Sequence, residues 1–327
     1  MRLGFDVGGT KTDAVVVGAG DEIVARVRRP TGWGAPEVVR TITELVDELA
    51  ASLGIQRSQF TSIGIGMPGQ VAPGSATVAH AVNLGVDELD LGEAIGTALG
   101  VPVRAENDVK AAAVGAYALH GMGRARADTM AYLNLGTGIA AGFVKGGRLW
   151  RGARGTAGEV GHISVDPNGP LCRCGQRGCI EAFCGGGAIA ERWHRAVALP
   201  VLDVFDAADA GDPAAIALRD GLAYGVASAI RVIVLSGDVE TVVLGGGVTA
   251  LGDRMLSRVV DELAAGAAAS PFLKSLRLAE RVELLPPGSP AAALGAALIG
   301  AAAEASVAPE PRSSDRQLSD RKAVFHG

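Results

Sequence analysis

The 327-residue sequence has no excess of positive charge, no long apolar run and few cysteines. Its 35 acidic residues outnumber its 30 lysines and arginines, and the formal net charge of −5 argues against nucleic acid as a partner. No stretch reaches the roughly 18 consecutive apolar residues of a membrane span, because Arg231 interrupts the longest apolar helix near 222–235. We therefore expect no membrane partner.

Three familiar signals are also missing. The opening MRLGFDVGGT is typical of a strand and a turn, without the charged segment and apolar core of a secretory signal, so we expect a cytoplasmic protein. Neither the P-loop spacing nor the Rossmann fingerprint occurs.

All four cysteines lie between Cys172 and Cys184. In a reducing compartment such a cluster favours metal binding over disulfides.

Strand and helix patterns alternate along the chain and predict an α/β fold. A strand, a glycine turn and a returning strand fill 3–17, and helix periodicity follows between Pro36 and Gly54. The opening pattern returns at 130–144 as MAYLNLGTGIAAGFV. The two copies indicate two halves built on one plan.

Three glycine turns follow predicted strands, and their backbone N–H groups suit phosphate oxygens. A single such turn is weak evidence, because tight hairpins also use glycine. Three at strand ends predict a nucleotide site, in which Asp6 holds Mg²⁺ through water and Thr10 and Lys11 reach phosphate. The residues concerned are Asp6, Gly8, Gly9, Thr10 and Lys11, then Gly136, Thr137 and Gly138, and finally Gly246 and Gly247.

The cysteine loop has the composition of a structural zinc site. Cys172, Cys174 and Cys179 present three thiols in a turn-rich segment, and His162 lies upstream. A tetrahedral site of three cysteines and one histidine is a common zinc arrangement. The alternative is three unligated thiols.

At this point the chain resembles a known superfamily. DVGGTKT, NLGTGIAAG and LGGGV are similar to the phosphate-1, phosphate-2 and adenosine motifs of the actin-like, sugar-kinase and heat-shock ATPases. GTAGEVGHISVDPNGPLCRCGQRGCIE, at 155–181, resembles the signature of the ROK family of bacterial sugar kinases and repressors. The resemblance implies two ribonuclease-H-like domains around a central cleft that holds ATP and a sugar, with a zinc-binding loop.

The expected domains follow from this resemblance. Residues 1–115 would form an N-terminal α/β domain, and 116–289 a C-terminal α/β domain with the zinc-binding loop at 162–184. A helix near 290–306 would pack back on the N-terminal domain, and the polar stretch 309–327 would be a disordered tail.

The resemblance also assigns the sugar site. It implies that Asp108 is the base for the sugar 6-hydroxyl, although at a strand–helix junction Asp108 could also be a helix cap. His162 would use one ring nitrogen for zinc and the other for sugar. Glu159 and Glu181 would bind hydroxyls, or else flank a structural loop as solvent-facing carboxylates. The implied sugar-binding set is Asn83, Asn107, Asp108, Glu159, His162 and Glu181.

Three positions depart from the family pattern: Lys110 replaces a usual Asn, Ala116 a usual Glu, and VDELD at 86–90 follows NLG where a Trp is common. Cys184 falls outside the ligand pattern and is expected in the core.

The resemblance thus implies an ATP- and Mg²⁺-dependent kinase for the 6-hydroxyl of a glucose-type hexose, with an amino or acetamido sugar as the alternative substrate.

The repressor branch of the family carries a helix-turn-helix ahead of the first glycine motif. Asp6 stands almost at the start of this sequence, so we do not expect a repressor. The family also implies a homodimer.

Overall fold

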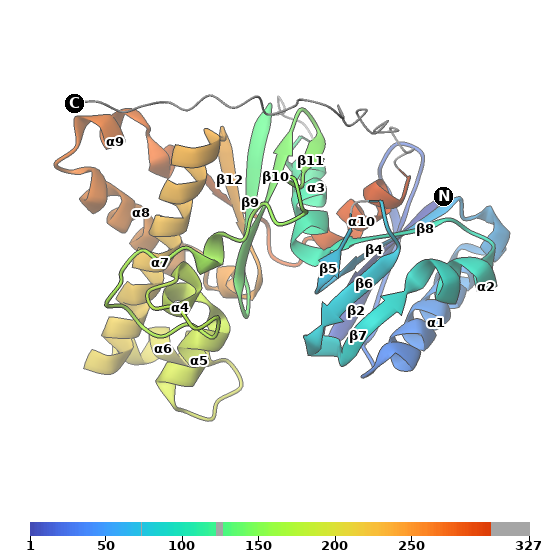
Figure 1. Ribbon diagram of the computed structural model, residues 1–327, viewed down its shortest axis with the longest axis horizontal. Helices are drawn as coiled ribbons and strands as arrows, with labels where there is room; N and C mark the ends of the chain where they lie inside the picture. Colours follow the sequence, from blue (N-terminus) through green and yellow to red (C-terminus); the bar gives the residue numbers. More distant parts are fainter. Residues whose placement is uncertain (73, 122–126, 302–327) are drawn as a thin grey trace, which may run out of the picture.

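The computed structural model describes residues 1–72, 74–121 and 127–301, and these form two five-stranded sheets of matching order (Figure 1). In each, three antiparallel strands are extended by two strands parallel to the first. The first sheet has the order β3-β2-β1-β4-β8, with β1 (Arg2–Val7), β2 (Lys11–Val17), β3 (Ile23–Pro30), β4 (Ser62–Met67) and β8 (Val103–Asn107). The second has the order β11-β10-β9-β12-β13, with β9 (Thr129–Leu135), β10 (Ile139–Lys145), β11 (Arg148–Trp150), β12 (Thr241–Gly245) and β13 (Val282–Leu284). The β1–β2 and β9–β10 hairpins are the two copies of the repeated sequence pattern.

A small third sheet and the helices complete the two halves. The third sheet contains β5 (Gln70–Val71), β6 (Thr77–Ala81) and β7 (Val86–Asp90). The helices are α1 (Ala35–Leu53), α2 (Thr97–Leu99), α3 (Asp108–His120), α4 (Ile180–Cys184), α5 (Gly186–Trp193), α6 (Pro200–Asp209), α7 (Pro213–Gly237), α8 (Asp253–Ala267), α9 (Pro271–Ser275) and α10 (Ala291–Ala301). The predicted tail 309–327 and residues 302–306 of the predicted last helix lie outside the described residues.

Helix α1 forms as its sequence predicts. Pro36 stands in its first turn, and Gly54 ends it with φ 64°, donating its N–H to the carbonyls of Ala50 and Ala51. That left-handed conformation is one that glycine adopts without strain. The apolar face, spaced at three and four residues, is buried against the first sheet.

Helix α7 is the central helix of the second half. Asp212 caps its N-terminus by accepting hydrogen bonds from Ala214 and Ala215. Its buried face includes the predicted Leu218, Leu222, Val226, Ile230 and Ile233. Although α7 has 25 residues, none of the helices in the described ranges combines the length and apolarity needed to cross a membrane.

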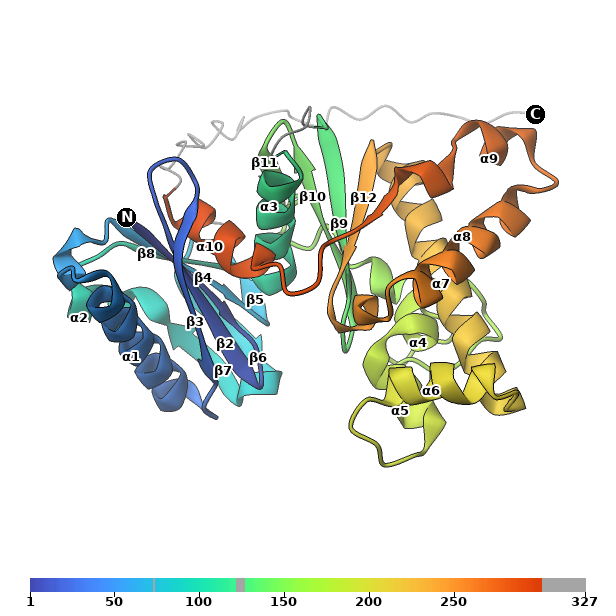
Figure 2. The ribbon, with the colours of Figure 1, turned by 180° about the vertical axis from the view of Figure 1, so that it is seen from behind.

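Helix α10 returns to the first sheet and lies beside α3 (Figure 2). The approach is backbone to backbone: a β-carbon added to Gly4 would lie 2.0 Å from the Ala293 carbonyl oxygen, and one added to Gly295 would lie 1.8 Å from the Ala111 carbonyl oxygen. Helix α3 also packs on β9 and β10, so it contacts both sheets. The predicted division at 115–116 falls inside this unbroken helix.

We predict that Gly295→Ala destabilises the protein by about 3 kcal/mol, because the added methyl group forces α10 away from α3. Gly221→Ala is the matched control in the interior of α7, where the nearest atom to an added β-carbon is Phe183 Cδ1 at 3.9 Å. With room for the methyl group, this change is expected to stabilise by about 0.5–1 kcal/mol. Chemical denaturation measures both, and equal effects would contradict the packing described here.

Candidate active site

The glycine turns lie at one edge of each sheet. Parallel strands end at a common edge, where α/β folds bind ligands. In the first sheet this edge carries the Gly8 turn after β1 and Asp108 after β8. In the second it carries the Gly136 turn after β9 and Gly246 after β12. The fold therefore brings the predicted phosphate turns to the two sheet edges.

A cavity of about 560 Å³ lies between the two halves. The first half contributes Asp6, Lys11 and Asp108, and the second contributes Gly246 and Gly247. The connection between β13 and α10, at 285–290, closes one side. Among the described residues, Gly8, Gly9, Thr10, Gly136, Thr137 and Gly138 do not line this cavity.

The second turn is held firmly in place. The N–H of Gly186 donates to the Gly136 carbonyl at 2.9 Å, and that of Gly187 donates to the Thr137 carbonyl at 3.0 Å. Both donors lie at the start of α5. The turn is therefore fixed by the helix that follows the cysteine loop.

Carboxylates crowd the cavity. The pKa of Asp6 is raised to about 7, mainly by burial and also by the negative charges of Asp108 and Asp13, with Lys11 acting in the opposite direction. Burial also raises the pKa of Asp108, with a contribution from Glu159. Carboxylate oxygens are the ligands that Mg²⁺ prefers, so Asp6 fits a role beside a hydrated magnesium ion.

Asp108 is not the residue that caps α3. The cap is Asn107, whose Oδ1 accepts from the N–H groups of Val109 and Lys110 at 3.1 and 3.3 Å. Asp108 is the first helical residue, and it faces the cavity. Asp108 Oδ1 also accepts from the Val109 N–H, at 2.9 Å, so Asp108 shares the helix end with Asn107 while its carboxylate faces the cavity.

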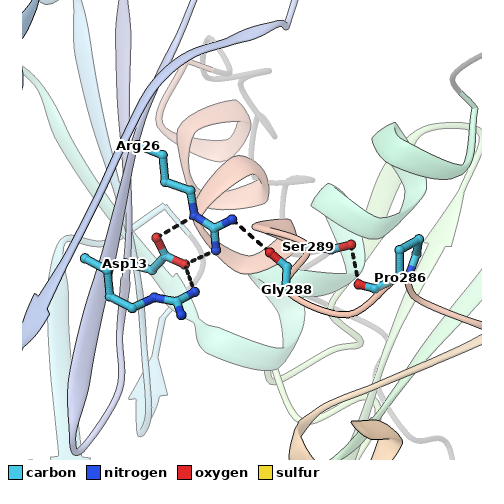
Figure 3. A network of polar contacts seen from close by, with 6 residues as sticks. Asp13, Arg26, Pro286, Gly288 and Ser289 are labelled. Atoms are coloured by element: carbon cyan, nitrogen blue, oxygen red, sulfur yellow. Dashed lines mark hydrogen bonds and ion pairs between the residues drawn. The ribbon is translucent and has the colours of Figure 1, made fainter. Parts of the chain in front are cut away.

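A network absent from the sequence predictions borders the same cavity (Figure 3). Buried Asp13 accepts from Arg26 Nε at 2.9 Å and from Arg28 Nη2 at 2.7 Å. Arg26 also donates to the Gly288 carbonyl at 2.8 Å. Burial opposes ionisation of Asp13, but the two arginines outweigh it and hold its pKa below the usual value. Arg26 thereby ties the first sheet to the connection that enters α10.

The predicted sugar-binding residues lie on several separate elements. Asn107 Nδ2 donates to the Gly69 carbonyl at 3.4 Å. Glu181 Oε2 accepts from the Ile139 N–H at 2.8 Å, directly after the second glycine turn. Glu159 and His162 are exposed at the two ends of the short 3₁₀ turn Val160–His162.

Two polar contacts join the loop before Glu159 to the end of β8 and the start of α3, where Asp108 lies. Arg151 Nε donates to Glu106 Oε2 at 2.7 Å, and Glu106 is buried. Buried Lys110, one of the departures from the family pattern, donates from Nζ to the Gly155 carbonyl. Both contacts hold the 151–155 loop against the β8–α3 junction.

The four predicted zinc ligands come together. Cys172 Sγ lies 3.9 Å from His162 Nδ1, Cys174 Sγ lies 3.6 Å from Cys179 Sγ, and all four ligand atoms are within 4.8 Å of one another. Burial and the neighbouring thiols raise the pKa of Cys179 to about 12, whereas hydrogen bonds from Gln176 lower that of Cys174 to about 6. A dication at the centre would relieve the repulsion among thiolates, so this donor set fits zinc.

Cys184 is separate from this cluster. It is fully buried in the core of the second half, and its Sγ donates to the Ile180 carbonyl at 3.2 Å.

Comparisons with known proteins identify the family of this chain. A model described as the ROK family matches residues 2–302. The chain belongs to the ROK family. It is 32% identical over 276 residues to a glucokinase of Halalkalibacterium halodurans, covering 79% of this chain and 83% of that protein. It is 34% identical over 250 residues to an N-acetylmannosamine kinase of Escherichia coli O157:H7, covering 75% and 82%.

A solved structure of a Streptomyces griseus ROK family glucokinase, in complex with glucose and AMPPNP, has a TM-score of 0.72 and 30% identity. The match covers 91% of this chain and 98% of that one. The fold of this ROK protein is therefore the α/β fold of the family's sugar kinases.

We predict that Asp6→Asn stabilises this ROK protein, by up to about 4 kcal/mol at pH 8, when no metal or nucleotide is bound. The folded chain raises the pKa of Asp6 from 3.8 to about 7, so stability is lost as the pH rises through this interval. Asparagine carries no charge, so its advantage fades towards pH 4.

Denaturant titrations between pH 4 and 8 measure this difference. Asp261→Asn, at an exposed position on α8, is the control. A gain for Asp6→Asn that does not change with pH would contradict the assignment.

Proposed function

We propose that this ROK protein transfers the γ-phosphoryl group of ATP to the 6-hydroxyl of a glucose-type hexose. It is an ATP-dependent sugar kinase. The observation that carries the proposal is the position of Asp108 at the first turn of α3, where it faces a cavity shared with Asp6, Lys11 and the third glycine turn. The glucokinase relatives support the choice of substrate.

ATP would lie along the three glycine turns. The backbone of Gly8, Gly9 and Thr10 and the Lys11 ammonium would contact phosphate oxygens, as would Gly136, Thr137 and Gly138. Gly246 and Gly247 would lie against the adenosine part. Mg²⁺, bound through water at Asp6, would neutralise charge on the phosphates.

The sugar would lie between the Asp108 junction and the signature loop. Asn83, Asn107, Glu159, His162 and Glu181 offer amide, carboxylate and imidazole groups for its hydroxyls. Asp108 would accept the proton of the 6-hydroxyl as that oxygen attacks the γ-phosphorus. Its raised pKa makes it a better proton acceptor than an ordinary carboxylate. Closure of the two halves would exclude water from the phosphoryl group.

Zinc in the cysteine cluster would fix the loop between His162 and Glu181. With one ring nitrogen of His162 on the metal, the other nitrogen has a defined tautomer and direction for a sugar hydroxyl. The loop also precedes α5, which anchors the second glycine turn. The metal would therefore organise the sugar side of the site.

An amino or acetamido sugar is the alternative substrate. The N-acetylmannosamine kinase relative supports it. Exposed Asp87, Glu88 and Asp90 on β7 would attract a protonated amine. We further propose a cytoplasmic homodimer without nucleic-acid or membrane partners.

A coupled assay of ADP release over a hexose panel tests the function. We expect the highest kcat/KM with glucose, and preference for an amino or acetamido hexose would instead select the alternative. ADP release that needs no sugar, or none with any hexose, would contradict the proposal.

Asp108→Asn is predicted to reduce turnover at least 1,000-fold while changing sugar affinity by less than about fivefold, because asparagine keeps the shape but loses the proton acceptor. ADP release and calorimetric titration of the sugar measure the two properties. A variant with near-normal turnover would assign Asp108 to the helix end alone.

Replacing any one of Cys172, Cys174 or Cys179 by Ser is predicted to weaken sugar binding more than tenfold while nucleotide binding is retained, because the loop loses its metal. Metal analysis should find about one zinc per chain in the wild type. Cys184→Ser is the control and should bind both metal and sugar normally. A metal-free preparation with full hexose affinity would refute this role for the cluster.

A further inference from the structure

Trp33 is an exposed aromatic side chain that the proposed site does not yet use. It follows β3, and 69% of its surface remains accessible. An indole is among the largest apolar groups in proteins, so leaving it in water forgoes a substantial hydrophobic gain. Tryptophan is enriched at binding interfaces, because its ring is apolar and its N–H can meet a polar partner.

The support of Trp33 is rigid. Before it, the Thr31 N–H donates to the Thr10 carbonyl at 3.2 Å, and the Thr31 and Thr12 hydroxyls lie 2.7 Å apart. After it, the Gly34 N–H donates to the Leu84 carbonyl at 2.8 Å. The backbone on both sides of Trp33 is therefore fixed.

The indole itself rests on Gly85. A β-carbon added to Gly85 would lie 2.5 Å from Trp33 Cε2, so a larger residue would displace the ring. Gly85 also has φ 66°, which favours glycine independently. One side of the ring is thus packed on backbone, while most of the side chain stays open to solvent.

Trp33 lies at the end of the first sheet where the glycine turn after β1 and Asp108 are found. Strand β3 runs parallel to β1, so the two end at the same edge. Asn83 lies two residues before Gly85, and its carbonyl oxygen would be 2.9 Å from a β-carbon on Gly9. The indole therefore lies beside the turn that carries Asn83 and close to the first phosphate turn.

We propose that Trp33 forms an aromatic wall of the hexose site and stacks on the apolar C–H face of the sugar ring. An aromatic face carries partial negative charge, which attracts the slightly positive C–H groups of a pyranose. The indole packs on Gly85, two residues after the proposed sugar-binding Asn83, and this argues for the sugar rather than the nucleotide. The inference rests on the proposed function and adds a residue that sets hexose affinity.

The test combines kinetics with fluorescence. Trp33→Ala should raise the KM for glucose about tenfold, with kcat and the KM for ATP within twofold, and Trp33→Phe should restore most of the affinity. Trp150→Phe is the matched control, because Trp150, on β11, is 56% exposed and packs on Phe143 of β10. Thermal melts should show all three variants folded.

In the Trp150→Phe protein, Trp33 is the only exposed tryptophan, because Trp193 is buried. Saturating glucose without ATP should then reduce quenching of its emission by acrylamide. An unchanged glucose KM in Trp33→Ala, or no protection of Trp33 from acrylamide by glucose, overturns the inference. The kinase function would still stand in that case, provided that the wild type turns over. Protection that follows protein concentration instead of glucose would assign Trp33 to contact with a second copy and also overturn it. No turnover by the wild type would be the failure of the proposed function itself.

Discussion

The repulsion among carboxylates at the meeting edge of the two halves is the constraint on which this site depends. Asp6, Asp13 and Asp108 line one cavity, and Glu159 is close enough to raise the pKa of Asp108. Among the described residues, arginines pair directly with Asp13 alone of these carboxylates, through Arg26 and Arg28. The remaining negative charge favours ligands that carry a cation or that can donate a proton to a carboxylate. Mg²⁺ with ATP, and a sugar hydroxyl, meet these two needs.

Carboxylates held this close together require a rigid scaffold, and close backbone packing at glycine and alanine residues provides it. Helix α10 contacts α3 and β1 through backbone atoms, so α3 keeps a fixed place with Asp108 at its first turn. The Glu106–Arg151 and Lys110–Gly155 contacts then align the loop before Glu159 with the same helix end. Small residues and two polar contacts thus set the relative positions of the proposed base and the sugar-binding loop.

Much of the frame was predictable from the sequence, because its signals are local. The apolar spacing and Gly54 predicted α1, and the repeated glycine hairpins predicted two halves built on one plan, which the two five-stranded sheets match. The Asp13–Arg26–Arg28 network was not predictable, because it depends on the register that places Asp13 opposite Arg28. The small sheet of β5, β6 and β7 was missed, because β5 has two residues and β7 is acidic. Trp33 carried no signal in sequence, since its neighbour Gly85 is distant along the chain.

The most direct test of the central claim is the position of the new phosphate ester. Incubation of the protein with ATP, Mg²⁺ and ¹³C-labelled glucose, followed by ³¹P and ¹³C NMR, reports which carbon couples to phosphorus. The account predicts coupling of phosphorus to C6 and, through three bonds, to C5, with none to C1, and no phosphorylated product from 6-deoxyglucose. A phosphate ester at C1, or product formed from 6-deoxyglucose, would contradict the role given to Asp108 and to the geometry around it.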